Sequence, residues 1–320
     1  QTVGKFKMDW LILAFLGTVF FSIAGVLDKL LLENYTYDSK AYIVCQALVQ
    51  LIFIIPVMLF VGVKFTYPES LFALLLGCLQ IFPTFFYMKA LQIEEASKVS
   101  AMEYAYPVFV LIGSIFLFGE ILSPKCYAGG LLLIIGTLFL SYKRDRGISR
   151  VSVGIYPKIK GSIKGLSPSI RPFMSFWILT AAYYLSLKYL LFSIDEWSLY
   201  IWSSLGTLIV AMPLMAVRSI REEVFGFFGR GSFAIGALIS EEAFQFLGLI
   251  FSIFAYAIGS VTLVSSVGAL QPILTVMLIM ILGALAPRLA KELNERTDRS
   301  SLMHKGAAFM MVIVGVYFVS

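Results

Sequence analysis

The chain is built from long apolar runs, and their length constrains its fold more than any other feature of the sequence. About 20 apolar residues are needed for one helix to cross a bilayer. In hydrocarbon the backbone amides of each run must pair within that run, which favours helices over open strands. We therefore predict an all-α polytopic membrane protein with ten transmembrane helices. They are expected at residues 10–32, 40–62, 70–92, 96–118, 124–142, 172–193, 197–217, 231–257, 260–284 and 303–320.

The composition supports a membrane protein and gives no sign of catalysis. Of the 320 residues, 59% are hydrophobic and 14% are charged, whereas about 25% are charged in an average soluble domain. His304 is the only histidine, and Cys45, Cys78 and Cys126 are scattered singly, so neither a disulfide framework nor a metal-binding spacing is present. The sequence contains no phosphate-binding loop or nucleophile motif. We expect no catalytic residue, no metal, no cofactor and no enzyme activity.

A strongly basic segment divides the chain near its middle. Residues 143–171 contain eight Lys or Arg residues and one acid, Asp145. Beside two membrane helices, such a segment is expected to lie on anionic lipid headgroups rather than on nucleic acid. It separates two regions with five predicted spans each, residues 1–142 and residues 172–320. We interpret these regions as two five-helix repeats joined by an inter-repeat loop.

An internal repeat relates the two regions. Residues 76–119 placed on the second half with an offset of 165 give eight identities in 44 positions. The pairs Gln80/Gln245 and Pro107/Pro272 carry the most weight, because aliphatic residues match easily between apolar helices. Two homologous regions with an odd number of spans must cross the membrane in opposite directions. Inverted repeats are typical of secondary transporters, which hold their substrate near the bilayer midplane between the repeats.

The segment around Pro107 carries a family resemblance. Small polar residues enter a helix, Pro107 follows within it, and then come the pair Gly119–Glu120 and a Gly-rich helix. The second half repeats this pattern around Pro272. The pattern resembles the second part of an EamA-type unit of the drug/metabolite transporter superfamily. That resemblance implies a ten-helix permease with both termini in the cytoplasm.

Glu103 needs an explanation because it lies inside an apolar run. A charged side chain within the bilayer costs ~2.5–3.5 kcal/mol even on lenient insertion scales. The ring of Pro107 clashes with the carbonyl of Glu103, four residues earlier, so we predict a bent helix with a carboxylate beside a wet cavity. Pro272 is expected to bend the ninth span in the same way. The alternative is a Glu103 that is buried for packing alone.

Two adjacent carboxylates lie inside the eighth predicted span. Successive residues of a helix point about 100° apart, so one face cannot hold both. Glu241 shares a face with Gln245 and is expected in the cavity, whereas Glu242 is expected to pair with a neighbouring helix, for example through a lysine. Two carboxylates near one cavity would also suit coupling to protons. Lys29 and Lys188 come near the end of the first helix of each half, where a lysine either snorkels to the interface or contacts the substrate or a gate.

Polar and small residues recur at helical spacing on eight of the predicted spans, which indicates a shared cavity. Any single residue of this kind also fits ordinary helix–helix packing in membranes, so only the whole set favours a cavity. Asp28 and Lys89 are expected at the membrane interface. The predicted substrate-binding or coupling residues are Glu103, Glu241, Gln245, Gln80, Tyr87, Tyr104, Tyr184, Lys188 and Lys29, and the predicted helix-bending residues are Pro107 and Pro272.

The orientation that the charges favour conflicts with the one that the family implies. Cytoplasmic loops normally hold the Lys and Arg residues. With both termini in the cytoplasm, 17 of these residues would lie in outside loops and 4 in inside segments. This bias favours termini outside, unless one span of the first half is miscounted.

Together these features predict a secondary active transporter of the cell or inner membrane, a permease or exporter of a small organic metabolite. Alternating access at a central cavity is the expected mechanism. An amino acid or an organic cation is the expected substrate, because carboxylates and aromatic rings both bind cations. A channel or a non-transporting scaffold is the alternative, and a nucleotide-sugar or phosphorylated-metabolite exchanger is a weaker one. The sequence leaves open whether the protein forms a homodimer.

Overall fold

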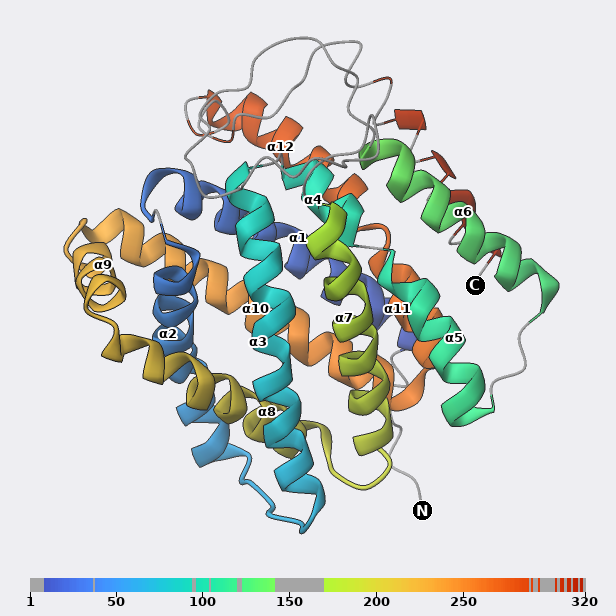
Figure 1. The fold of residues 1–320 in the computed structure, drawn as a ribbon, viewed down its shortest axis with the longest axis horizontal. Coiled ribbons are helices and arrows are strands. Elements are labelled where there is room, and N and C mark those ends of the chain that lie inside the picture. Colours follow the sequence, from blue (N-terminus) through green and yellow to red (C-terminus); the bar gives the residue numbers. More distant parts are fainter. Residues whose placement is uncertain are drawn as a thin grey trace.

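The protein is described here by a computed structural model, in which all regular structure of the described residues is helical (Figure 1). Residues 9–287 are described except 37, 94–95, 104, 120–122 and 142–169, together with scattered positions between 289 and 318. The predicted all-α class is confirmed for this part of the chain. The basic segment 143–171 and most of the last predicted span, 303–320, lie outside the described residues.

The helices follow the predicted spans closely over most of the described chain. The first half contains α1 (Trp10–Asn34), α2 (Ser39–Phe60), α3 (Glu69–Ile93), α4 (Ala96–Glu103), α5 (Tyr106–Phe118) and α6 (Pro124–Ser141). The second half contains α7 (Ile170–Leu190), α8 (Glu196–Ala211), the 3₁₀ helix η1 (Met212–Ala216), α9 (Arg218–Phe228), α10 (Ser232–Ile258), α11 (Val261–Gly268) and α12 (Gln271–Leu285).

Six stretches are long and apolar enough to cross a membrane, which makes the chain an integral multi-pass membrane protein. Large apolar side chains on the outside of the bundle support this conclusion, since Phe60 is 88% exposed and Phe116 is 83% exposed. A soluble protein would rarely leave such surface to water. The predicted count of ten spans stays a prediction. The six stretches are Trp10–Asn34, Ser39–Phe60, Glu69–Gln92, Glu196–Ala216, Ser232–Ile258 and Val261–Leu285.

Local sequence signals set several helix ends. Asp38 accepts a hydrogen bond from the backbone N–H of Lys40 at 2.8 Å, and Asp195 accepts one from Ser198 at 3.0 Å. Such N-cap side chains satisfy amide groups that have no partner in the first turn. Gly119 ends α5 with a φ of 65°, a left-handed conformation that glycine adopts without a steric penalty.

The two mid-helix prolines begin new helices, so the prediction of a single bent helix around each of them is wrong. The first helix stops at Glu103, and α5 starts with Tyr106 and Pro107. In the second half α11 stops at Gly268, and Pro272 is the second residue of α12. Proline has no N–H to donate, so the first turn of a helix tolerates it where a helix interior does not.

The helices of the two halves interleave. Figure 1 shows α1 lying along α10, with the two helices running in opposite directions, and α3 close to α7 and α8. Glycines bring α3 and α8 together, because Gly77 packs against the backbone of Ser203 and Gly206 against the backbone of Leu74. Small residues allow this close approach of helix backbones in membranes.

The connection after η1 contains a short amphipathic helix that the sequence prediction treated as loop. Ile220, Val224 and Phe227 bury one face of α9. On the opposite face Arg218 pairs with Glu222 at 2.7 Å, four residues away. This helix is too polar to span a membrane and packs beside α2.

Candidate functional site

A cavity of about 170 Å³ lies where α1, α2, α3 and α4 meet α7, α8, α10 and α12. Both halves of the chain therefore contribute to its wall, as expected of a site between two repeats. Most of the lining side chains that carry polar groups are uncharged amides or hydroxyls. The charged or amide-bearing lining residues are Asp28, Glu103, Glu242, Gln46, Gln50, Gln80, Gln245 and Gln271.

Five of the predicted site residues lie in this wall. Gln80 and Gln245, which the internal repeat relates, both line the cavity, as do Tyr87, Tyr184 and Glu103. Their shared location is what the helical spacing of polar residues predicted. Tyr104 lies outside the described residues.

Glu103 lies at the C-terminal end of α4 and faces the cavity. Its Oε2 is buried and receives no hydrogen bond from the described residues. The end of α4 is held by Trp177 on α7, whose Nε1 donates to the carbonyl of Met102 at 2.6 Å. An anchored carboxylate with an unsatisfied oxygen is a ready acceptor for a cationic or hydrogen-bonding ligand.

Asp28 is a site residue that the sequence prediction placed wrongly at the interface. Its side chain is buried, and Oδ1 accepts hydrogen bonds from the hydroxyl of Tyr42 at 2.8 Å and from Nε2 of Gln46 at 3.1 Å. It also lines the cavity. Spacing could have revealed it, because Asp28 follows Gly25 by three residues and therefore shares the polar face of α1.

The roles expected of the two adjacent glutamates are reversed. Glu242 lines the cavity, and no lysine in the described part of the chain pairs with it. Glu241 does not line the cavity; it is fully buried behind the wall, within hydrogen-bonding reach of Asp28 and close to Gln46. Neither of its oxygens receives a well-formed hydrogen bond within the described chain. The rotation of α10 about its axis decides which glutamate faces inward.

Two neutral side chains on α7 also present unsatisfied polar atoms to the cavity. Thr180 is 7% exposed and Tyr183 is 3% exposed, and both belong to the lining. Their hydroxyl oxygens find no hydrogen-bond partner among the described residues. Buried hydroxyl groups normally have a partner, so these two groups favour a polar ligand or water in the cavity.

An aromatic group separates the cavity from a smaller one. The ring of Tyr184 stacks on Tyr106 with centroids 5.2 Å apart and lies 5.1 Å from the ring of Tyr256. Tyr184 and Phe21 line both the main cavity and a second cavity of about 20 Å³. The two cavities thus lie on either side of one aromatic partition.

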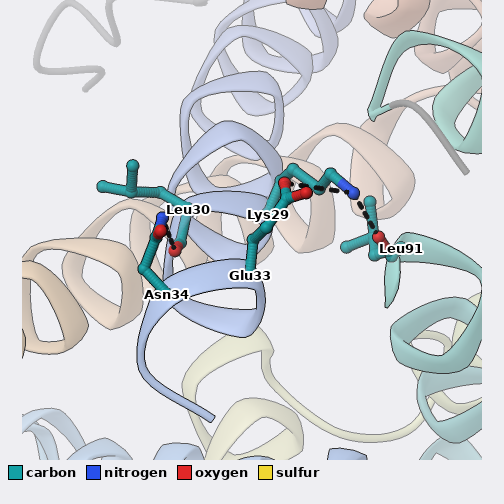
Figure 2. Close-up of polar contacts among 5 residues, drawn as sticks. All are labelled: Lys29, Leu30, Glu33, Asn34 and Leu91. Atoms are coloured by element: carbon teal, nitrogen blue, oxygen red, sulfur yellow. Dashed lines mark hydrogen bonds and ion pairs between the residues drawn. The ribbon is translucent and has the colours of Figure 1, made fainter. Parts of the chain in front are cut away.

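The two predicted lysines do not line the cavity, so the expectation of a direct substrate contact is wrong for this structure. Lys29 donates to the backbone carbonyl of Leu91 at 2.6 Å and pairs with Glu33 at 3.4 Å (Figure 2). Lys188 donates to the carbonyls of Tyr256 at 2.7 Å and of Gly259 at 3.0 Å. Lys29 is only 4% exposed, which also excludes the snorkelling alternative for it.

Fold and site together define a polytopic membrane protein that encloses a polar, acidic cavity between its two halves. The model of the EamA-like transporter family matches residues 8–142. The chain is therefore a membrane protein of the EamA family, within the drug/metabolite transporter superfamily that the sequence pattern around Pro107 indicated.

Solved structures extend the likeness to both halves. One of them, described only as "Crystal structure of protein", has a TM-score of 0.56 and 16% sequence identity, and the match covers 97% of this chain and 96% of that chain. At this identity the likeness concerns the fold alone. No curated protein matches the sequence.

Proposed function

We propose that the protein is a secondary transporter of small organic solutes that carry a cationic group. The charge of the cavity is the observation that carries this proposal. Asp28, Glu103 and Glu242 reach the wall from three helices, and no lining residue that the structure describes is basic. Carboxylates buried in a membrane are normally functional, and their natural ligands are cations.

The acidic wall narrows the substrate class that the sequence left open. An amino acid would bring a carboxylate into a cavity with three acidic side chains and no basic group among the described lining residues. A phosphorylated metabolite or a nucleotide sugar would bring more negative charge still. The volume of about 170 Å³ is also below the ~300–1,000 Å³ of pockets that enclose drug-sized ligands. A small amine therefore fits best.

The arrangement of the helices supports an inverted repeat. The broken helices α4 and α11 span eight residues each, and the offset between them is the same 165 residues that relates the sequences. Helix contacts obey the same exchange of halves, since α1 packs on α10 as α7 packs on α3, and α4 packs on α12 as α11 packs on α5. We propose that alternating access arises from relative movement of the two sets of helices.

Proton coupling is proposed from the contact between Asp28 and Glu241. Both side chains are buried and lie within hydrogen-bonding reach of one another. An ionised carboxylate has no hydrogen to donate, so a hydrogen bond between two carboxyl groups requires a proton on one of them. Because Asp28 also lines the cavity, an arriving ammonium group could displace that proton.

Replacement of Glu241 by Gln is expected to remove this coupling. In proteoliposomes, amine uptake driven by a pH gradient should fall strongly, while exchange of labelled for unlabelled amine continues, because Glu241 does not line the cavity. A Glu222→Gln variant, which changes an exposed glutamate on α9, is the control. Equal loss of gradient-driven uptake and of exchange would contradict a coupling role.

Counterflow in proteoliposomes tests the transport proposal itself. Vesicles loaded with an unlabelled small amine should accumulate the labelled amine transiently, and the initial rate should saturate with concentration. Flux that neither saturates nor shows counterflow would indicate a channel. Absence of flux for amines, amino acids and organic acids alike would indicate a non-transporting scaffold.

A further inference from the structure

The two buried lysine contacts occupy equivalent places in the two halves. Lys29 on α1 donates to the carbonyl of Leu91 near the end of α3, and Lys188 on α7 donates to the carbonyl of Tyr256 near the end of α10. Leu91 and Tyr256 are separated by 165 residues, the same offset that relates the repeats. The sequence does not reveal this equivalence, because the lysines themselves are 159 residues apart.

The acceptors explain why a lysine is suited to both places. The last carbonyls of an α-helix have no partner within the helix, and the C-terminal end of a helix attracts a positive charge. Leu91 and Tyr256 each precede the end of their helix by two residues, at Ile93 and Ile258. Each lysine therefore satisfies groups that would otherwise be unpaired in an apolar surrounding.

Both contacts join helices that belong to different packing groups. The helix α1 lies along α10 and also contacts α11 and α12, whereas α3 lies along α7 and α8. Lys29 thus ties the α1–α10 group to the α3–α7 group from one side, and Lys188 ties the same two groups in the reverse sense.

The two ties lie at opposite ends of the bundle. In Figure 1 the C-terminal ends of α1 and α3 lie toward the top, and those of α7 and α10 lie toward the bottom. The second cavity, which Tyr256 lines, lies on the α10 side of the aromatic partition. One lysine therefore sits at each end of the path that runs through the main cavity.

We propose that Lys29 and Lys188 are a matched pair of gate latches, one closing each end of the cavity. This inference rests on the proposed alternating access and adds the residues that control it. Opening one end requires α1 to part from α3, which breaks the contact between Lys29 and Leu91. Opening the other end requires α7 to part from α10, which breaks the contacts of Lys188.

Each lysine keeps a partner on its own side when its latch opens. Lys29 pairs with Glu33, one turn further along α1, at 3.4 Å, and Figure 2 shows both interactions from the same ammonium group. Lys188 lies over the ring of Phe192 at 5.4 Å from its centroid, also four residues further along the chain. The ammonium groups therefore remain partly satisfied in the open state, so each latch is reversible.

Accessibility of the cavity from each side of the membrane tests the latches. A single reporter cysteine at Thr207, which lines the cavity, is introduced after replacement of Cys45, Cys78 and Cys126. A membrane-impermeant thiol reagent is then applied to either side of oriented proteoliposomes. The assay needs no substrate, so its outcome is independent of whether the counterflow experiment succeeds.

The expected result is a change of opposite sense in the two variants. Lys29→Met should raise the modification rate from one side, and Lys188→Met from the other, by about tenfold, the weight of one charged hydrogen bond in an equilibrium constant. Lys40→Met, which changes an exposed lysine at the start of α2, should raise neither. Lys29→Arg and Lys188→Arg keep a charged donor and should resemble the parent protein.

Three results would overturn the proposal. They are an increase from the same side in both methionine variants, no increase in either, and an arginine variant that opens its end as fully as methionine does. If a methionine variant is too unstable to reconstitute, the arginine variants still decide, because a latch that needs only a charged donor must leave them closed.

Discussion

A Glu103→Gln variant is expected to lose most of its affinity for small amines while remaining folded. Glu103 faces the cavity from the end of α4, and its Oε2 lacks a hydrogen-bond donor among the described residues. Removing one partner of a buried charge pair typically costs ~2–5 kcal/mol of binding free energy, which corresponds to at least about thirtyfold in the dissociation constant. The amide is nearly isosteric, so packing around Met102 and Trp177 is retained.

Thermal unfolding in detergent measures this effect directly. A ligand present at a hundred times its dissociation constant adds about 2.7 kcal/mol to the stability of the folded state, so the parent protein should show a clear rise in melting temperature with an amine. The variant should show little or none at the same concentration. Glu222→Gln, at an exposed glutamate, is the control and should respond like the parent. Equal stabilisation of Glu103→Gln would place the binding site elsewhere, with Glu242 as the next candidate.

Alanine at Gly77 or Gly206 is expected to be the most damaging small substitution in the chain. A Cβ atom at Gly77 would meet the backbone of Ser203, and one at Gly206 would meet the backbone of Leu74. Neither contact can be relieved by a change of rotamer, so α3 and α8 would have to move apart. Overpacking typically costs ~1–3 kcal/mol and occasionally more, and we expect the upper end of that range here.

Gly236 provides a matched control on the same class of helix. It lies on α10 and is exposed, and an added Cβ there meets no atom within 4 Å. Alanine at this position should stabilise the helix slightly, by roughly 0.5–1 kcal/mol. Apparent stabilities from thermal unfolding in one detergent give the comparison. Losses at Gly77 and Gly206 no larger than the change at Gly236 would show that α3 and α8 do not pack as closely as described.

Most of the described helices and part of the cavity could be predicted from the sequence, because both depend on periodicity. Apolar runs give the bounds of a membrane helix, and the helical period groups Gln80 with Tyr87 on one face. The paired prolines also marked the correct places in both halves. What they do there was predicted wrongly, because a proline at the second helical position begins a helix, and the sequence alone does not show where the preceding helix stops.

The remaining site residues depend on tertiary geometry that a single sequence does not contain. Choosing between Glu241 and Glu242 requires the rotation of α10 against its neighbours, since the two residues point about 100° apart. Asp28 follows from the face of α1 but needed Tyr42 and Gln46 on α2 to make its burial favourable. The acceptors of the lysines are backbone carbonyls, and these have no signature in the side-chain pattern.

The central claim is that the cavity selects for positive charge, and a matched series of ligands tests it most directly. Putrescine, γ-aminobutyrate and succinate share a four-carbon chain and differ in whether its ends carry ammonium or carboxylate groups. Their dissociation constants for the purified protein can be measured by calorimetry at one pH and ionic strength. The acidic lining predicts tightest binding of putrescine, weaker binding of γ-aminobutyrate and no measurable binding of succinate. Binding of γ-aminobutyrate or succinate as tight as that of putrescine would contradict it.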